Sequence, residues 1–397
     1  MSRRPASDLL AQGLRQHQAG RLEAAGRLYR QVLAREPGNA NALNLLGLVA
    51  HRSGRTDDAL DLLRQAVARH PASALFLRNL ASVQQAAGAL ADAIASFRRA
   101  HDLAPEDAGI LNDLGTALNA ARQTSAAADA FRRAAALAPE AAAIHYNLGN
   151  AELKRGHREA AVRAFRRAVA ADPELHRARH ILDALTGRQS DRPPDDYVRH
   201  LFDDYAERFE SDLVETLGYR VPSLLRQALE RLPDASRRFA AALDLGCGTG
   251  LSGAAFRDIV DRLRGVDLSP GMIAKADGRG IYDALVTAPI VDMLEADDDR
   301  YDLILATDVL VYIGDLAALF AALPARCADG ALFLFSTESA EGDSFVLRDS
   351  GRFAHAPAYV RRLAAAQGFG LLFSQPVDIR QGPDGPVAGE VYILRKE

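Results

Sequence analysis

A glycine-rich stretch between two acids carries the clearest chemical signal in the sequence. Residues 243–250 read Leu-Asp-Leu-Gly-Cys-Gly-Thr-Gly, and Asp267 follows 17 residues after the last of these glycines. An apolar run before closely spaced glycines, then a second run ending in an acid, is typical of strand, tight turn, helix and strand. Glycines let backbone N–H groups approach a bound molecule, and a carboxylate accepts two hydrogen bonds. The stretch therefore predicts a cofactor-binding turn.

Strand and helix signals alternate around this turn, as they do in α/β proteins. Helix-length segments separate five apolar runs, which are residues 240–245, 263–267, 284–287, 301–307 and 330–336. This alternation predicts a mainly parallel sheet with helices on both faces. Residues 371–380 and 387–394 flank a Gly- and Pro-rich turn and predict a hairpin at the sheet edge. Ser269 and Pro270 suit the cap and first turn of the helix after the second strand.

The front half of the chain is an internal repeat with a period of 34 residues. Four positions of each copy stay constant in character. They are a small residue (Gly13, Gly47, Ala81, Gly115, Gly149), Ala (Ala25, Ala59, Ala93, Ala127, Ala161), a large one (Tyr29, Leu63, Phe97, Phe131, Phe165) and Pro (Pro37, Pro71, Pro105, Pro139, Pro173). Small residues let two helices approach closely, the large side chain fills the groove, and Pro ends the second helix. We therefore predict five helix-turn-helix units.

This period and pattern resemble the tetratricopeptide repeat (TPR). We expect three parts. The first, residues 6–186, contains five repeats and a capping helix from Leu175 to Leu185. The second, residues 187–196, is an exposed linker rich in Gly, Pro and charged residues. The third is the α/β domain over 197–397, a Rossmann-like fold.

Repeats of this family usually bind a peptide or protein on their inner face. The residues expected there are Asn79, Asp113 and Asn147, one repeat apart. They could hold a peptide backbone, or they could merely follow the repeat consensus. Arg pairs beside the core Phe of three repeats read as a solvated helix face, because no exposed aromatic residues are interleaved with them. Nucleic acid is therefore an unlikely partner.

The glycine turn differs from the dinucleotide-binding fingerprint, which is Gly-x-Gly-x-x-Gly. The spacing Gly246-x-Gly248-x-Gly250, with Asp244 ahead of it, resembles motif I of class I S-adenosylmethionine-dependent methyltransferases. That resemblance implies a seven-stranded, mostly parallel sheet with an antiparallel C-terminal hairpin, and S-adenosylmethionine as cofactor. It also implies that Asp267 accepts both ribose hydroxyls. The further cofactor-binding residues expected from it are Cys247, a small packing residue of the turn, and Leu268.

Residues 301–310 resemble the fourth-strand motif of the same family, whose end, at Asp308, faces the transferable methyl. They are not Asn-Pro-Pro-Tyr or Asp-Pro-Pro-Tyr, which disfavours bases and glutamine as acceptors. The acid that often contacts adenine is replaced by Ala288-Pro289, so either Asp292 or backbone groups take that role. Tyr205 lies on a helix that resembles one covering the cofactor, although it could simply pack there. The order of domains resembles bacterial predicted TPR methyltransferases.

Methyl transfer needs alignment of acceptor and methyl, and a base only if the acceptor starts protonated. Candidates lie after the fourth and fifth strands, where open α/β sheets place their sites. The catalytic candidates are Tyr312, Glu338 and His355, of which His355 titrates in the range suited to a base.

Composition excludes several classes of protein. The two cysteines, Cys247 and Cys327, provide neither a disulfide framework nor metal-ligand spacing, so no metal is expected. The first residues lack a signal-peptide core, and no apolar run reaches membrane-spanning length. We therefore expect a cytoplasmic protein without a membrane partner.

The sequence leaves three functions open. The first is a methyltransferase whose repeats recruit the substrate, either a protein or a small molecule, or a partner. The second is an interaction scaffold with a weak or inactive methyltransferase domain. The third, a nucleic-acid methyltransferase, is less favoured.

Overall fold

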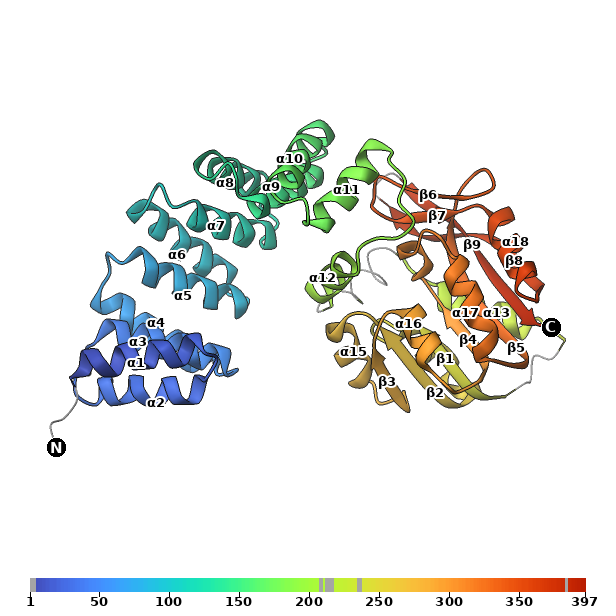
Figure 1. The fold of residues 1–397 in the computed structure, drawn as a ribbon, viewed down its shortest axis with the longest axis horizontal. Helices are drawn as coiled ribbons and strands as arrows, with labels where there is room; N and C mark the ends of the chain where they lie inside the picture. The colour runs from blue at the N-terminus through green and yellow to red at the C-terminus, as the bar shows by residue number, and fades with distance from the viewer. Residues whose placement is uncertain (1–4, 207–209, 211–217, 234–237, 383–384) are drawn as a thin grey trace. The chain divides into compact units, whose positions relative to one another are not determined.

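The computed structural model describes residues 5–206, 210, 218–233, 238–382 and 385–397 (Figure 1). The chain divides into two compact units, Met1–Leu175 and His176–Glu397. The first unit contains helices alone, and the second contains a sheet covered by helices. Each unit is described separately below.

The first unit consists of successive antiparallel helix pairs, visible from α1 to α10 in Figure 1. Their bounds are α1 (Ala6–Gln18), α2 (Leu22–Leu33), α3 (Ala40–Arg52), α4 (Thr56–Arg69), α5 (Ala74–Ala86), α6 (Leu90–Leu103), α7 (Ala108–Ala120), α8 (Thr124–Leu137), α9 (Ala142–Lys154) and α10 (Arg158–Ala171). Side chains cap several first helices. Asn39 accepts the N–H of Ala42 at 2.9 Å, and Asp107 accepts that of Gly109 at 2.8 Å.

Each repeat packs its large side chain against a small residue of the partner helix, as the sequence predicts. A Cβ added to Gly115 would lie 2.6 Å from Cε1 of Phe131, and one added to Gly149 would lie 2.7 Å from Cε1 of Phe165. Phe131 and Phe165 are buried. The glycines therefore set how closely the two helices of a repeat can approach.

The second unit is built on a nine-stranded sheet with the order β3-β2-β1-β4-β5-β7-β6, in which β9 also pairs with β5 and β8. The strands are β1 (Phe239–Leu245), β2 (Val260–Asp267), β3 (Ala284–Thr287), β4 (Tyr301–Ala306), β5 (Cys327–Ser339), β6 (Phe345–Leu347), β7 (Phe353–His355), β8 (Phe369–Gly382) and β9 (Gly385–Lys396). Strands β1 to β5 are parallel, whereas β9 is antiparallel to β5 and β8. The predicted parallel sheet with a C-terminal hairpin is confirmed, and the β6–β7 hairpin is an unpredicted addition.

Helices cover both faces of this sheet (Figure 1). They are α11 (His176–Thr186), α12 (Asp195–Tyr205), α13 (Val221–Glu230), α14 (Leu251–Phe256), α15 (Pro270–Asp277), α16 (Ile290–Ala296), α17 (Ala317–Arg326) and α18 (Pro357–Ala366), with short 3₁₀ turns η2 (Arg257–Ile259) and η3 (Leu310–Tyr312). Neighbouring strand residues enter different cores. Leu243 packs with α16, α17 and α18, whereas Ala242 packs with α13 and α14. No described helix is long and apolar enough to cross a membrane.

The helix after the last repeat packs on the second unit, which differs from the expected capping role. Nε2 of His180 lies 2.9 Å from the carbonyl oxygen of Gly351, and Ala184 is buried with Leu347 and Phe353. The apolar face of α11 therefore packs against the β6–β7 region. This contact was not predicted. By contacts the second unit begins at His176, whereas the sequence suggests a boundary at 187.

The expected linker is also tied to the second unit. Oε1 of Gln189 accepts the N–H of Leu347 at 2.8 Å, and the carbonyl oxygen of Asp191 accepts the N–H of Asp315 at 2.7 Å. Pro193 is buried. Residues 187–194, here called the connector, therefore follow the surface of the second unit and do not form a free linker.

Candidate active site

The glycine turn joins β1 to α14 through three left-handed residues. Gly246, Gly248 and Gly250 have φ angles of 65°, 53° and 93°, which L residues rarely adopt. A Cβ at Gly246 would collide with the side chain of Val309. Glycine is thus required at this turn both by backbone conformation and by the close approach of the loop after β4.

Asp267, the last residue of β2, faces this turn. Its Oδ2 accepts the N–H of Gly248 at 2.9 Å and its Oδ1 accepts the N–H of Ser269 at 2.8 Å. Burial raises the pKa of this carboxyl, and the two N–H donors oppose that rise. Since each carboxylate oxygen has two lone pairs, the held carboxylate can still accept hydrogen bonds from a bound molecule.

Asp244 lies beneath the turn and does not line the cavity described below. Its Oδ2 accepts the hydroxyl of Tyr282 at 2.7 Å. Burial raises its pKa to about 7, and the Tyr282 hydrogen bond opposes the rise. Gly265 makes room for this tyrosine, because a Cβ there would lie 2.9 Å from Cε1 of Tyr282. The structure therefore places Asp244 as a support for the turn, and sequence analysis did not identify its partner.

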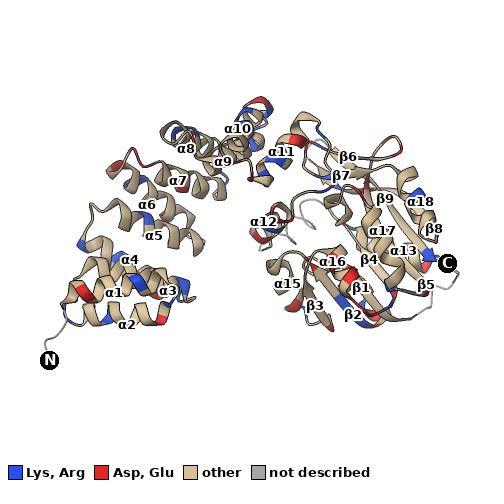
Figure 2. Ribbon diagram, in the orientation of Figure 1, with Lys and Arg blue, Asp and Glu red and all other residues tan. Residues whose placement is uncertain are grey.

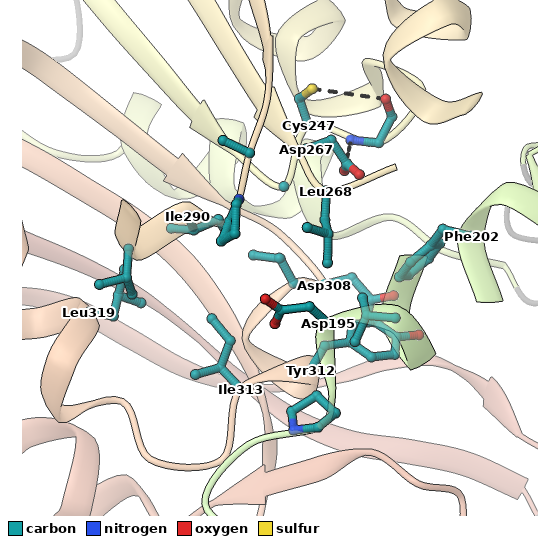
Figure 3. Close-up of a pocket in the computed structure, with 18 of the residues that line it drawn as sticks. Asp195, Phe202, Cys247, Asp267, Leu268, Ile290, Asp308, Tyr312, Ile313 and Leu319 are labelled. Atoms are coloured by element: carbon teal, nitrogen blue, oxygen red, sulfur yellow. Dashed lines mark hydrogen bonds between the residues drawn. The ribbon is translucent and has the colours of Figure 1, made fainter. Parts of the chain in front are cut away.

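A cavity of about 360 Å³ opens beside the turn, at the carboxyl ends of the parallel strands (Figure 3). That volume falls in the range of small-molecule sites. Ile290 and Leu319 lie on one side and Phe202 and Tyr312 on the other. The principal lining residues are Asp195, Phe202, Tyr219, Gly246, Cys247, Gly248, Asp267, Leu268, Ala288, Ile290, Asp292, Asp308, Tyr312 and Ile313.

Asp308 lies in the loop just after β4, in a strained conformation. Its φ of 52° is left-handed, which is uncommon for a residue with a Cβ. Its N–H donates to Oγ of Ser336 at 3.1 Å, and its Oδ1 accepts from Nη1 of Arg380 at 3.0 Å. Arg380 also donates to Glu338. The cavity wall at Asp308 is therefore held by residues of β5 and β8.

Two aromatic rings stand next to Asp308. Phe202 and Tyr312 meet edge to face, with ring centroids 5.0 Å apart. The guanidinium of Arg352 lies 4.9 Å from the Tyr312 ring centroid and donates to the Tyr312 hydroxyl. These contacts fix the orientation of Tyr312 at the cavity surface.

Of the predicted catalytic residues, only Tyr312 lines the cavity. His355 is fully buried, with Nε2 2.9 Å from the carbonyl oxygens of Ile313 and Gly314, and burial lowers its pKa. Glu338 is 2% exposed and is held by Arg380. Both side chains face the protein interior, so the structure gives neither of them contact with a bound substrate.

The remaining predicted cofactor contacts mostly converge on the cavity. Leu268, Asp292 and Asp308 line it together with the glycine turn. The side chain of Tyr205 lies outside the described residues. Cys247 is buried, which raises the pKa of its thiol well above the usual value and agrees with a packing role. Among the described residues, no group of three His, Cys, Asp or Glu could hold a metal ion.

Sequence reasoning missed the part of the cavity that comes from the connector and the helix after it. Asp191, Arg192 and Pro193 line the cavity, as does Asp195 at the start of α12. A stretch rich in Pro and charge signals an irregular segment but does not indicate what it touches. Tyr219 was also missed, because it belongs to none of the motifs or repeats seen in the sequence.

The predicted inner-face residues of the repeats are partly exposed and linked from one repeat to the next. Nδ2 of Asn79 donates to Oδ1 of Asn44 at 3.0 Å, and Nδ2 of Asn147 donates to Oδ1 of Asn112 at 2.9 Å. Asp113 accepts from Nε of Arg78 at 2.7 Å. Basic and acidic residues are both scattered over α1–α10 (Figure 2).

Comparison with known families agrees with this division of the chain. A model described as a methyltransferase domain matches residues 217–367, and two tetratricopeptide repeat models match residues 16–82 and 112–176. The chain combines tetratricopeptide repeats with a methyltransferase domain. The predicted repeats and the predicted methyltransferase domain are thereby confirmed.

Among known proteins, human methyltransferase-like protein 27 is 34% identical over 113 residues, which cover 28% of this chain and 46% of that protein. The chain thus spans about half the length of that relative. Two solved repeat structures are also similar. MamA is 25% identical, with a TM-score of 0.39, over 41% of this chain and 95% of that one. YrrB, described as a TPR protein with an unusual peptide-binding site, is 20% identical, with a TM-score of 0.39, over 44% and 91%.

Proposed function

We propose that the second unit is a class I, S-adenosylmethionine-dependent methyltransferase. The observation that carries this proposal is the pairing of Gly248 with Asp267 across the mouth of β1 and β2. The backbone N–H of Gly248 holds the carboxylate at 2.9 Å, so a glycine cradle and an acceptor-only group face the same cavity. This arrangement suits a molecule whose hydroxyl groups donate to Asp267 while a neighbouring part packs against the backbone of the glycine turn.

The residues present fit that cofactor. Asp267 would accept the ribose hydroxyls, and Leu268 and Ile290 would cover the adenine with apolar surface. The glycine turn leaves room for the methionine part, because Gly246, Gly248 and Gly250 carry no Cβ. When bound, S-adenosylmethionine supplies a methyl group activated on a sulfonium. The acidic lining, which contains Asp267, Asp292 and Asp308, favours a cationic ligand.

The chain itself contributes positioning and exclusion of water. Tyr219, Asp308 and Tyr312 lie where parallel strands of open α/β sheets end, which is where such folds place substrates. Arg380 and Arg352 fix two of these side chains. Side chains that are already fixed in the folded protein align an acceptor better than mobile side chains do, because binding does not have to order them.

We propose that the repeats recruit a peptide or protein, either the substrate or a partner that brings it. Their stacked pairs and the partly exposed row of Asn79, Asp113 and Asn147 support this role. The scattered charge of both signs on α1–α10 gives no support to nucleic-acid binding.

Titration calorimetry of the full chain with S-adenosylmethionine tests the enzyme proposal. We expect micromolar binding, and a loss of about 100-fold in Asp267→Ala, because two hydrogen bonds to a charged group are worth about 3 kcal/mol or more together. Asp277→Ala, an exposed acid at the end of α15, is the matched control and should bind normally. Absence of binding by the intact chain would favour the scaffold instead.

A further inference from the structure

The cavity has a second half beyond the cofactor residues, and its walls indicate what it accepts. We call this the acceptor half and define it by Asp195, Phe202, Tyr219, Asp308 and Tyr312. Phe202 and Tyr312 stand apart from Ile290 and Leu319, on the other side of the cavity (Figure 3). Because Asp308 follows shortly after Ala306, the last residue of β4, this half lies next to the expected position of the transferable methyl.

Aromatic rings give the acceptor half apolar, rigid walls. Tyr219 and Tyr312 are 6% and 7% exposed, so only small parts of each side chain face the opening. Phe202 meets Tyr312 edge to face. Flat ring surfaces bury carbon skeletons with little loss of side-chain entropy, and they attract cations through their negative faces.

The charge of the cavity lining is strongly one-sided. Its ionisable carboxylates are Asp191, Asp195, Asp267, Asp292, Asp308 and Asp315, and its single guanidinium is that of Arg192. Arg380 and Arg352 both pair with Asp308, backbone N–H groups hold Asp267, and Asp315 accepts the hydroxyl of Tyr359. Asp195 has no hydrogen bond or ion pair with any other described side chain. It is partly buried and at the start of α12, so its carboxylate is left for a ligand.

We propose that the methyl acceptor is an amine carried on an aromatic or apolar body, held with its nitrogen toward Asp195. This inference rests on the proposed methyltransferase function and adds the class of acceptor. An anionic acceptor would meet like charges on the cavity wall, and this repulsion disfavours its binding. An alcohol would displace water from Asp195 and leave the carboxylate without a cation.

Nitrogen chemistry in this half needs few groups from the protein. An amine bound as its ammonium ion first loses a proton to a lining carboxylate or to water, which frees the nitrogen lone pair. That lone pair forms the new bond to the methyl carbon, while the carbon–sulfur bond breaks and its electron pair stays on sulfur. The nitrogen then carries the positive charge that sulfur gives up, so charge balances.

Three matched probes separate the acceptor classes, namely 2-phenylethylamine, 2-phenylethanol and phenylacetate. Each is titrated by calorimetry into the full chain saturated with S-adenosylhomocysteine, and each is then offered with tritiated S-adenosylmethionine. We expect the amine to bind at least 10-fold more tightly than the alcohol, phenylacetate not to bind, and label to enter the amine alone. Asp195→Asn should abolish the preference for amine over alcohol. Asp329→Asn, an exposed acid on β5, is the control and should keep it.

The outcomes separate a failure of the amine inference from a failure of the proposed methyltransferase function. If the chain fails to bind S-adenosylmethionine, the methyltransferase proposal itself fails. If S-adenosylmethionine binds normally but the amine binds no better than the alcohol, or label enters the alcohol or phenylacetate, the amine inference alone is overturned. Retention of the amine preference in Asp195→Asn would also overturn it.

Discussion

Nη1 of Arg380 donates to Oδ1 of Asp308 at 3.0 Å, across 72 residues of sequence. Arg380 comes from the C-terminal strand β8 and Asp308 from the loop just after β4, at the cavity wall. Both side chains are 9% exposed, and Glu338, the other partner of Arg380, is 2% exposed. One buried cation thus fixes two buried carboxylates. Through Arg380, the C-terminal hairpin holds the side chain of Asp308 in the cavity wall.

Replacing Arg380 by Gln should therefore destabilise the second unit. Removing one partner of a buried ion pair costs about 3–5 kcal/mol, and we expect the lower end of that range because Arg352 stays 3.8 Å from Asp308 and 3.6 Å from Glu338. Urea denaturation gives the free energy of unfolding, and Arg395→Gln, an exposed cation on β9, is the control. A loss in Arg380→Gln no larger than that of the control would show that the pair contributes little.

The buried carboxyl of Asp244 should make stability depend on pH. Burial raises its folded pKa to about 7 from a usual value of 3.8. Between these values the folded state keeps a proton that the unfolded state has lost, so stability falls as pH rises through this window, on the order of a few kcal/mol.

Asp244→Asn should remove that slope, because the amide keeps an acceptor for the Tyr282 hydroxyl but does not titrate. Denaturation midpoints at several pH values between 4 and 8 test this, with Asp329→Asn as the control for an exposed acid. An unchanged slope in Asp244→Asn would assign the pH dependence to other groups.

Close helix contact within a repeat should make Gly115 intolerant of a methyl group. A Cβ at Gly115 would lie 2.6 Å from Phe131, whereas one at Gly26, also in a helix, comes no closer than 3.3 Å and meets the flexible end of Arg30 first. We expect Gly115→Ala to cost about 1–3 kcal/mol by overpacking. Gly26→Ala should be neutral or stabilising, because Ala favours helices over Gly by about 1 kcal/mol. Thermal melts followed by circular dichroism would reveal any reversal of this order.

Local signals made much of the fold predictable. The repeat period is visible because each copy must bring Gly and Phe together, and the glycine turn is visible because three left-handed residues need glycine. Strands β1 to β4 were predicted to within about three residues, and the signal is clearest in β1 and β4, which are nearly continuous buried apolar runs.

Features created by tertiary contact were not predictable in this way. Strands β6 and β7 contain three residues each, too few for a periodic pattern. His355 and Glu338 were credible candidates by residue type and strand position. The structure shows them turned inward, where Nε2 of His355 lies at the carbonyl oxygens of Ile313 and Gly314 and Glu338 accepts from Arg380.

The contacts of α11 and the connector determine where the repeats could be replaced by other repeats without disturbing the second unit. A recombination joint at residue 187 would replace α11, and with it the contacts that cover Leu347 and Phe353. A joint after Leu175 would leave the whole second unit intact, including Asp191, Pro193 and Asp195 in the cavity wall. New repeat arrays could then be grafted onto the same methyltransferase without altering the pocket, provided that the exchanged segment ends before His176.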